Sequence, residues 1–121
     1  MRASFPEVLH VKPCPDGHPD HRLVQVDGAV TAELALPRGA LLHLDRRRAP
    51  RNGDVVLAEV VVQQRRTQTV RRFTQAENVV SLARIASPDG RPAARTSLIR
   101  PRYEVGILGV VDGHIVPLDQ S

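Results

Sequence analysis

Short apolar runs separated by turn-forming residues dominate the chain from residue 22 onward. Residues 55–62 form the longest run and are mostly β-branched, which is typical of a strand buried on both faces. The same reasoning predicts further strands at residues 22–27, 40–44, 67–73, 78–85, 105–111 and 114–116. One or two helical turns are expected near residues 31–36, before a turn at 37–39. The pattern therefore predicts a mostly β fold.

Turn signals fix where these strands should end. Asn52-Gly53 predicts a sharp turn after the loop 46–53, and Arg65-Arg66 is expected to mark the turn before the strand 67–73. Asp112-Gly113 is a strong hairpin signal and predicts that strands 105–111 and 114–116 pair with each other. Residues 87–92 form a loop by composition.

The first 21 residues differ from the rest. They contain Pro6, Pro13, Pro15 and Pro19, and proline removes backbone donors and blocks helix formation. We therefore expect residues 1–21 to form a loop or extended arm, followed by a single β domain over residues 22–121.

Length and composition narrow the class of protein. The chain has 121 residues, enough for one domain, and no apolar run approaches the roughly 20 residues that a membrane span needs. Its single cysteine excludes an internal disulfide and fits a reducing compartment, so a cytoplasmic protein without membrane contact is expected. Only two Phe and one Tyr are present, with no Trp, which argues against an aromatic platform for single-stranded nucleic acid.

Four blocks in order resemble the C-terminal domain of LexA-type repressors and UmuD-like proteins, which are self-cleaving serine–lysine peptidases. Residues 26–31 (Val-Asp-Gly-Ala-Val-Thr) stand where the family has Val-x-Gly-Asp-Ser-Met, and residues 39–45 resemble its Gly-Asp-Leu-Leu-x-Val strand. Residues 51–58 (Arg-Asn-Gly-Asp-Val-Val-Leu-Ala) and 69–73 (Thr-Val-Arg-Arg-Phe) are similar to its Asn-Gly-Asp-Ile-Val-x-Ala and Thr-Val-Lys-Arg-Leu segments. The resemblance covers about 95 residues and implies a fold of small twisted β-sheets.

The departures from the family pattern bear on catalysis. The family's nucleophilic serine position is occupied by Val30, and its general-base lysine position by Arg71. A valine has no nucleophile, and an arginine stays protonated and cannot act as a base. Arg71 is instead expected to fill the former active site, paired with Glu33 or Asp27. We therefore expect no enzyme activity.

Family members commonly dimerise through the C-terminal strand region. If this carries over, residues 103–111 would be the pairing segment, and the alternative is an ordinary core strand. The interaction residues expected on this basis are Tyr103, Val105, Ile107, Leu108 and Val110. The resemblance thus implies a non-catalytic interaction or dimerisation module, a homodimer or a heterodimer with an active relative. Its setting would be bacterial stress, the DNA-damage (SOS) response or transcription regulation.

Charge offers a second hypothesis. The net charge is +4, and Lys12 is the only lysine beside 16 arginines. Four arginines lie in the loop 46–51, and Arg65, Arg66, Arg71 and Arg72 flank the following hairpin. If the two sets lie close in space they would form a phosphate-binding stripe; otherwise they are solvated surface charges. The candidates for this nucleic-acid surface are Arg46, Arg47, Arg48, Arg51, Arg65 and Arg66.

The arm also offers a candidate metal site. Thiolate and imidazole are ligands that Zn²⁺ prefers, four of them in a tetrahedron. The candidate ligands are His10, Cys14, His18 and His21. The alternative is a set of polar residues in an arm that holds no metal, and no other cofactor is expected, because the chain has no phosphate-cradling glycine loop or dinucleotide motif.

Overall fold

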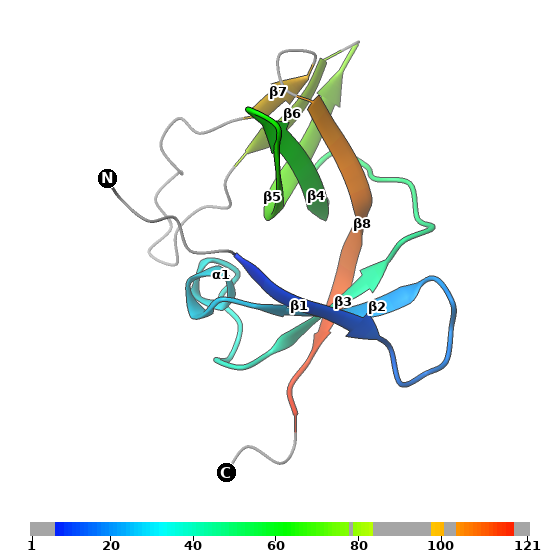
Figure 1. Cartoon of the computed structure of the whole chain (residues 1–121). Helices are drawn as coiled ribbons and strands as arrows, with labels where there is room; N and C mark the ends of the chain where they lie inside the picture. Colours follow the sequence, from blue (N-terminus) through cyan, green and yellow to red (C-terminus); the bar gives the residue numbers. More distant parts are fainter. Residues whose placement is uncertain (1–6, 78, 84–97, 101–103, 118–121) are drawn as a thin grey trace.

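The computed structural model describes residues 7–77, 79–83, 98–100 and 104–117. Its strands form one eight-stranded antiparallel sheet in the order β1-β2-β3-β8-β4-β5-β6-β7 (Figure 1). The elements are β1 Val8–Pro13, β2 His21–Val26, α1 Gly28–Glu33, β3 Leu41–Asp45, β4 Val55–Val62, β5 Arg65–Ala76, β6 Val79–Ala83, β7 Leu98–Arg100 and β8 Glu104–Ile115. The mostly β prediction is therefore confirmed.

The strand β8 joins the two halves of the sheet. Its residues 104–111 pair with β4, whereas residues 110–115 pair with β3. Figure 1 shows β8 running between a group formed by β4–β7 and a group formed by β1–β3. The strands thus form one continuous array rather than the separate small sheets that the resemblance implied.

The helical turn forms earlier than expected. Its first residue is Gly28 because Asp27 acts as the N-cap, with Oδ1 accepting a 2.8 Å hydrogen bond from the amide of Ala29. The helix ends before Ala35, whose φ of 56° is left-handed. The prediction of a helical turn is confirmed, but it placed the start three residues too late.

The β4–β5 hairpin turns at a different pair of residues from the one predicted. Gln63 and Gln64 have φ of 51° and 68°, as a two-residue turn of the mirror-image type requires. Arg65 already pairs with Val62, so Arg65-Arg66 begins β5 instead of marking the turn. Glutamine is not a usual residue at such positions, and the prediction was therefore wrong by two residues.

The predicted hairpin at Asp112-Gly113 is wrong. β8 continues through this dipeptide as one strand of twelve residues. Gly113 pairs with His43 and Val111 pairs with Leu44, so Asp112 is the extra residue of a β-bulge. The turn predicted at Asn52-Gly53 is confirmed, because Gly53 lies in a turn with φ of 92°.

The proline-rich N-terminal segment is extended over residues 8–13 and pairs with β2 as the first strand of the sheet. Pro13 is its last residue, a position at the sheet edge where a missing backbone donor costs little. The polar residues 14–20 then form the turn between β1 and β2.

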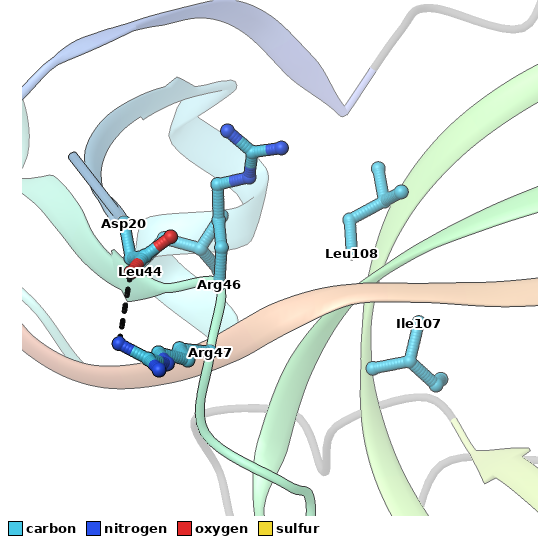
Figure 2. Close-up of a pocket in the computed structure, with 6 residues that line it drawn as sticks. All are labelled: Asp20, Leu44, Arg46, Arg47, Ile107 and Leu108. Atoms are coloured by element: carbon cyan, nitrogen blue, oxygen red, sulfur yellow. Dashed lines mark ion pairs between the residues drawn. The ribbon is translucent and has the colours of Figure 1, made fainter.

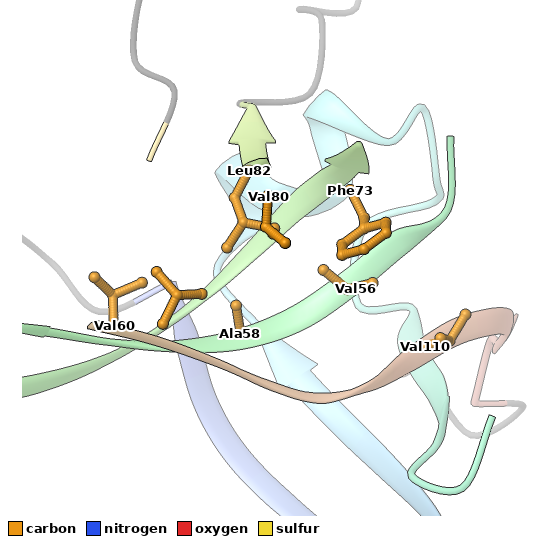
Figure 3. Packing of buried hydrophobic residues seen from close by; sticks show 8 residues of the cluster. Val56, Ala58, Val60, Phe73, Val80, Leu82 and Val110 are labelled. Carbon is orange, nitrogen blue, oxygen red and sulfur yellow. The ribbon is translucent and has the colours of Figure 1, made fainter. Parts of the chain in front are cut away.

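Two clusters of buried side chains form the core. The first joins β2, α1 and β3 to β4 and β5; its buried members are Val24, Val26, Val30, Leu42, Leu44, Leu57 and Val70. The second lies on β4, β5, β6 and β8; its buried members are Val56, Ala58, Val60, Phe73, Val80, Leu82, Val105 and Val110 (Figure 3). Neighbouring residues of β4 point into opposite clusters, as the continuous apolar run predicted.

Within the described ranges, none of the helical structure has the length and hydrophobicity that crossing a membrane requires.

Candidate functional site

The two positions that the resemblance aligns with the family's serine and lysine hold Val30 and Arg71. Val30 is buried in the first core cluster, 4% exposed. The neighbouring Thr31 is also buried, and its hydroxyl donates to the carbonyl of Gly28 at 2.9 Å. Nε of Arg71 donates to Oγ1 of Thr69 at 3.0 Å. The carboxylate of Asp27, one of the partners expected for Arg71, caps α1.

Glu7, which the sequence did not single out, lies beside this position. Its Oε1 accepts hydrogen bonds from the hydroxyl of Thr69 at 2.8 Å and from the amide of Val70 at 3.0 Å. Its carbonyl accepts from the amide of Asp27 at 2.8 Å. One residue of the N-terminal segment therefore ties the start of α1 to β5 across the first core cluster.

A second group of chemically active side chains surrounds the β1–β2 turn. The thiol of Cys14, the carboxylate of Asp16 and the imidazole of His43 each offer a ligand atom, and these atoms all lie within 4.8 Å of one another. Cys14 is buried, whereas Asp16 is exposed and His43 is half-buried. The turn and the middle of β3 thus bring together a thiol, a carboxylate and an imidazole.

Asp16 is the hub of this group. Its Oδ2 lies 2.7 Å from Nδ1 of His21, and its Oδ1 accepts from the amide of His18 at 2.9 Å. The hydrogen bond from His21 lowers the pKa of Asp16 to about 2, with a further contribution from the His18 amide. The same hydrogen bond raises the pKa of His21 above its ordinary value. The ring of His18 stacks on that of His21 with centroids 4.0 Å apart.

The bulge in β8 adds a further carboxylate. Asp112 Oδ1 lies 2.5 Å from His43 Nδ1. The ring of His43 also meets that of His21 edge-on, with centroids 4.7 Å apart. Strand pairing explains why His21 and Asp112 approach His43. His21 lies two residues before Leu23, which pairs with His43 on β2, and Asp112 directly precedes Gly113, which pairs with His43 on β8.

The four-residue ligand set predicted from the sequence does not form. Cys14 and His21 both contact Asp16 and His18 stacks on His21, but His10 is exposed on β1 opposite Gln25. Four residues of extended chain, roughly 13 Å, separate it from Cys14. Sequence reasoning missed Asp16, His43 and Asp112 as members of the group, because two of them come from strands distant in sequence.

The arginine candidates separate into two places. Arg46, Arg47, Arg48 and Arg51 lie in the loop before β4, whereas Arg65 and Arg66 begin β5 beyond its far end. The eight residues of β4 span roughly 24 Å, so one continuous stripe does not form. Arg66 lies 3.5 Å from Glu59. The interpretation of Arg65 and Arg66 as partners of the loop arginines is therefore wrong.

The loop arginines border a groove of about 590 Å³, lined by Asp20, Leu44, Arg46, Arg47, Ile107 and Leu108. Figure 2 shows Arg46 and Arg47 on the side of Asp20, whereas Leu108 and Ile107 lie farther along β8 and on opposite sides of that strand. NH1 of Arg47 lies 3.9 Å from Oδ2 of Asp20. Among the residues that the structure describes, neither Arg46 nor Arg48 takes part in an ion pair.

The interaction residues expected on β8 divide by exposure. Val105 and Val110 are buried in the second core cluster, as the core-strand alternative expects. Ile107 and Leu108 are half-buried and line the groove. Tyr103 lies outside the described residues. β3 pairs with β8 only from Val110 onward, so β4 is the one described strand paired with residues 104–109.

Comparison of the chain with models of known protein families and with curated proteins finds no match in either case.

Proposed function

We propose that this chain is a non-catalytic protein-interaction module that binds an acidic, aliphatic segment of a partner protein in the groove that Arg46, Arg47, Ile107 and Leu108 line. The observation that carries the proposal is the mixed lining of this groove, which combines two arginines with half-buried aliphatic side chains. Such a surface suits a peptide that presents carboxylates to the arginines and apolar side chains to the aliphatic residues.

The positions of the family dyad support the non-catalytic part of the proposal. Val30 is an aliphatic residue in the core, and Arg71 is hydrogen-bonded to Thr69. A guanidinium cannot accept the proton that a lysine base would take. In a relative of LexA and UmuD-like proteins, binding without cleavage would make this chain a regulatory partner in the DNA-damage response.

A protein partner explains the groove better than nucleic acid does. Three of the six residues that line the groove are aliphatic, namely Leu44, Ile107 and Leu108. A phosphate backbone would instead be met by cations and polar groups. The described aromatic residue that could stack on a base, Phe73, is buried in the core at 4% exposure. The length of β4 also separates Arg65 and Arg66 from the loop arginines, which shortens the stripe that a duplex would follow.

The experiment is a binding titration with a matched charge control. A labelled peptide of alternating Glu and Leu is titrated into the protein, with an alternating Lys and Leu peptide as the reference ligand. The double variant Arg46→Glu/Arg47→Glu should abolish binding of the acidic peptide. The double variant Arg65→Glu/Arg66→Glu changes net charge equally at the far end of β4 and should retain it.

The same variants are then used to recover partners from the native cells, with and without DNA damage, after nuclease treatment. A protein retained by the wild type and by the Arg65/Arg66 variant but lost from the Arg46/Arg47 variant supports the proposal. Equal loss from both variants, or loss of all material on nuclease treatment, contradicts it and favours the nucleic-acid hypothesis. Sedimentation velocity distinguishes a second copy of the chain as the occupant, and a constant intact mass at alkaline pH tests the absence of self-cleavage.

A further inference from the structure

We propose that Cys14, Asp16 and His43 form a zinc site that fastens the β1–β2 turn to β3. The inference stands apart from the proposed function, since it uses none of the residues of the groove. It revises the ligand set expected from the sequence: of the four predicted ligands only Cys14 is kept, and Asp16 and His43 replace His10, His18 and His21.

The donor atoms are close to the arrangement that zinc requires. A tetrahedral ion with bonds of about 2.0–2.3 Å keeps neighbouring ligand atoms about 3.3–3.8 Å apart. In the structure the three candidate atoms lie within 4.8 Å of one another, and Nε2 of His43 is 4.0 Å from Oδ2 of Asp16. A contraction of at most about 1.5 Å closes the site, and Asp16 is an exposed residue of the turn.

His43 is oriented by a second carboxylate. Its Nδ1 contacts Asp112, which leaves Nε2, 4.0 Å from Oδ2 of Asp16, as the ring nitrogen directed toward the proposed ion. Histidine ligands in metal sites generally donate their other ring N–H to such a carboxylate, which fixes the tautomer and increases ligand basicity. The β8 bulge therefore supplies the outer partner of the proposed ligand.

The other two ligands are held in a similar way. The amide of His18 donates to Oδ1 of Asp16, and Nδ1 of His21 lies 2.7 Å from Oδ2. The thiol of Cys14 is also hydrogen-bonded to Asp16. On binding, zinc takes the place of the thiol proton, which passes to solvent, and water occupies the fourth position.

The donor set selects the class of metal. A thiolate, a carboxylate and a neutral imidazole together carry two negative charges, which a divalent ion balances. The thiolate and imidazole favour zinc over magnesium or calcium, which prefer oxygen ligands alone. The proposed role of the ion is structural. It would link the β1–β2 turn to β3 directly, in addition to the backbone pairing between β2 and β3.

The test measures metal binding by the full chain, freed of metal and kept reduced. Isothermal titration and native mass spectrometry with Zn²⁺ alone should give one bound ion per chain. Titration with Co²⁺ should give the charge-transfer absorption of a thiolate ligand. Variants Cys14→Ser, Asp16→Asn and His43→Gln should each greatly weaken binding, and Asp112→Asn should weaken it by about 10–100-fold. The Cys14→Ser variant should also lose the thiolate absorption.

His10→Gln is the matched control, since it removes an imidazole from the same hairpin but outside the cluster. It should bind zinc as the wild type does. Circular dichroism of each metal-free variant verifies that it is folded, and the surface variant Asp16→Asn keeps the test informative if a less exposed substitution unfolds the chain. The proposal is overturned if the wild type binds no zinc, if cobalt gives no thiolate band, or if His10→Gln weakens binding as much as the ligand variants do.

Discussion

Asp112 and His43 are in contact although 69 positions separate them in the chain, with Asp112 Oδ1 2.5 Å from His43 Nδ1. The contact depends on a bulge, since Asp112 is the residue left unpaired where β8 crosses from Val111 to Gly113 opposite β3. Bulges often redirect a side chain next to a functional site. An Asp-Gly pair commonly forms a hairpin turn. In this strand it forms a bulge that orients a carboxylate toward an imidazole.

Gly109 is expected to be a position where any side chain disrupts the sheet. A Cβ there would lie 2.8 Å from Cγ of Leu44 and 2.9 Å from the carbonyl oxygen of Asp45. The oxygen belongs to the backbone of β3 and cannot withdraw without breaking the β3–β8 pairing. Gly109→Ala should therefore lower the free energy of unfolding by about 1–3 kcal/mol, measured by urea denaturation.

Gly106 provides the control on the same strand, because a Cβ there meets no atom within 4 Å. Gly106→Ala should leave the free energy of unfolding nearly unchanged or raise it slightly. Equal destabilisation by both substitutions would show that strand conformation, rather than the contact with β3, sets the cost.

Much of the sheet was predictable because its strands carry local signals. The run of Val55–Val62 appears in the structure with the predicted bounds, since a continuous apolar strand between two turns has few alternatives. The error at Asp112-Gly113 has a different origin. The dipeptide favours a turn locally, but pairing on both sides holds β8 extended, and only the register of β3 against β8 shows that a bulge is needed.

The candidate site was predictable only in part for a related reason. Cys14, His18 and His21 are close in sequence, and their clustering could be inferred. His43 and Asp112 reach the same place through two strand pairings, which no local pattern reports. Glu7 was missed because a single glutamate in a proline-rich segment has no spacing that predicts a bond to β5.

The two core clusters should unfold together. β4 contributes Leu57 to the first and Val56 to the second, so neither cluster can open without disturbing that strand. Leu42→Ala and Leu82→Ala should each lower the free energy of unfolding by about 2–5 kcal/mol. Both should shift a single transition, monitored by circular dichroism and by hydrogen exchange.

Leu9→Ala serves as the reference substitution, because Leu9 is 52% exposed and should change stability by less than about 0.5 kcal/mol. Two separate transitions in the Leu82→Ala variant would show that the half built on β5 and β6 unfolds by itself.

Glu7 should stabilise the sheet through the bonds it accepts. Glu7→Ala leaves the amide of Val70 without its acceptor, at a cost of about 1–3 kcal/mol. Hydrogen exchange at the Val70 amide should become faster in this variant. Glu104→Ala removes an exposed carboxylate from β8 and should change neither quantity. Thr69→Val removes the second donor, and its effect should be smaller in the Glu7→Ala background if the two residues are coupled.

His21 and Asp16 should give the metal-free protein a defined pH dependence. The pKa of His21 is raised by Asp16, so its contribution to stability is complete below its unfolded pKa of about 6.5 and is lost as pH rises through the folded value. The pKa of Asp16 is lowered to about 2, so its contribution is present above pH 3.8 and is lost as pH falls toward 2. The pair therefore stabilises the turn most between these limits.

The measurement is an NMR titration of the histidine ring protons in the presence of a chelator. His21 should titrate above 6.5 in the wild type, and Asp16→Asn should return its pKa toward 6.5, because the charged acceptor is gone. A His21 pKa that stays raised in Asp16→Asn would assign the shift to the more distant carboxylates of Asp45 and Asp112 instead of to the hydrogen bond within the turn.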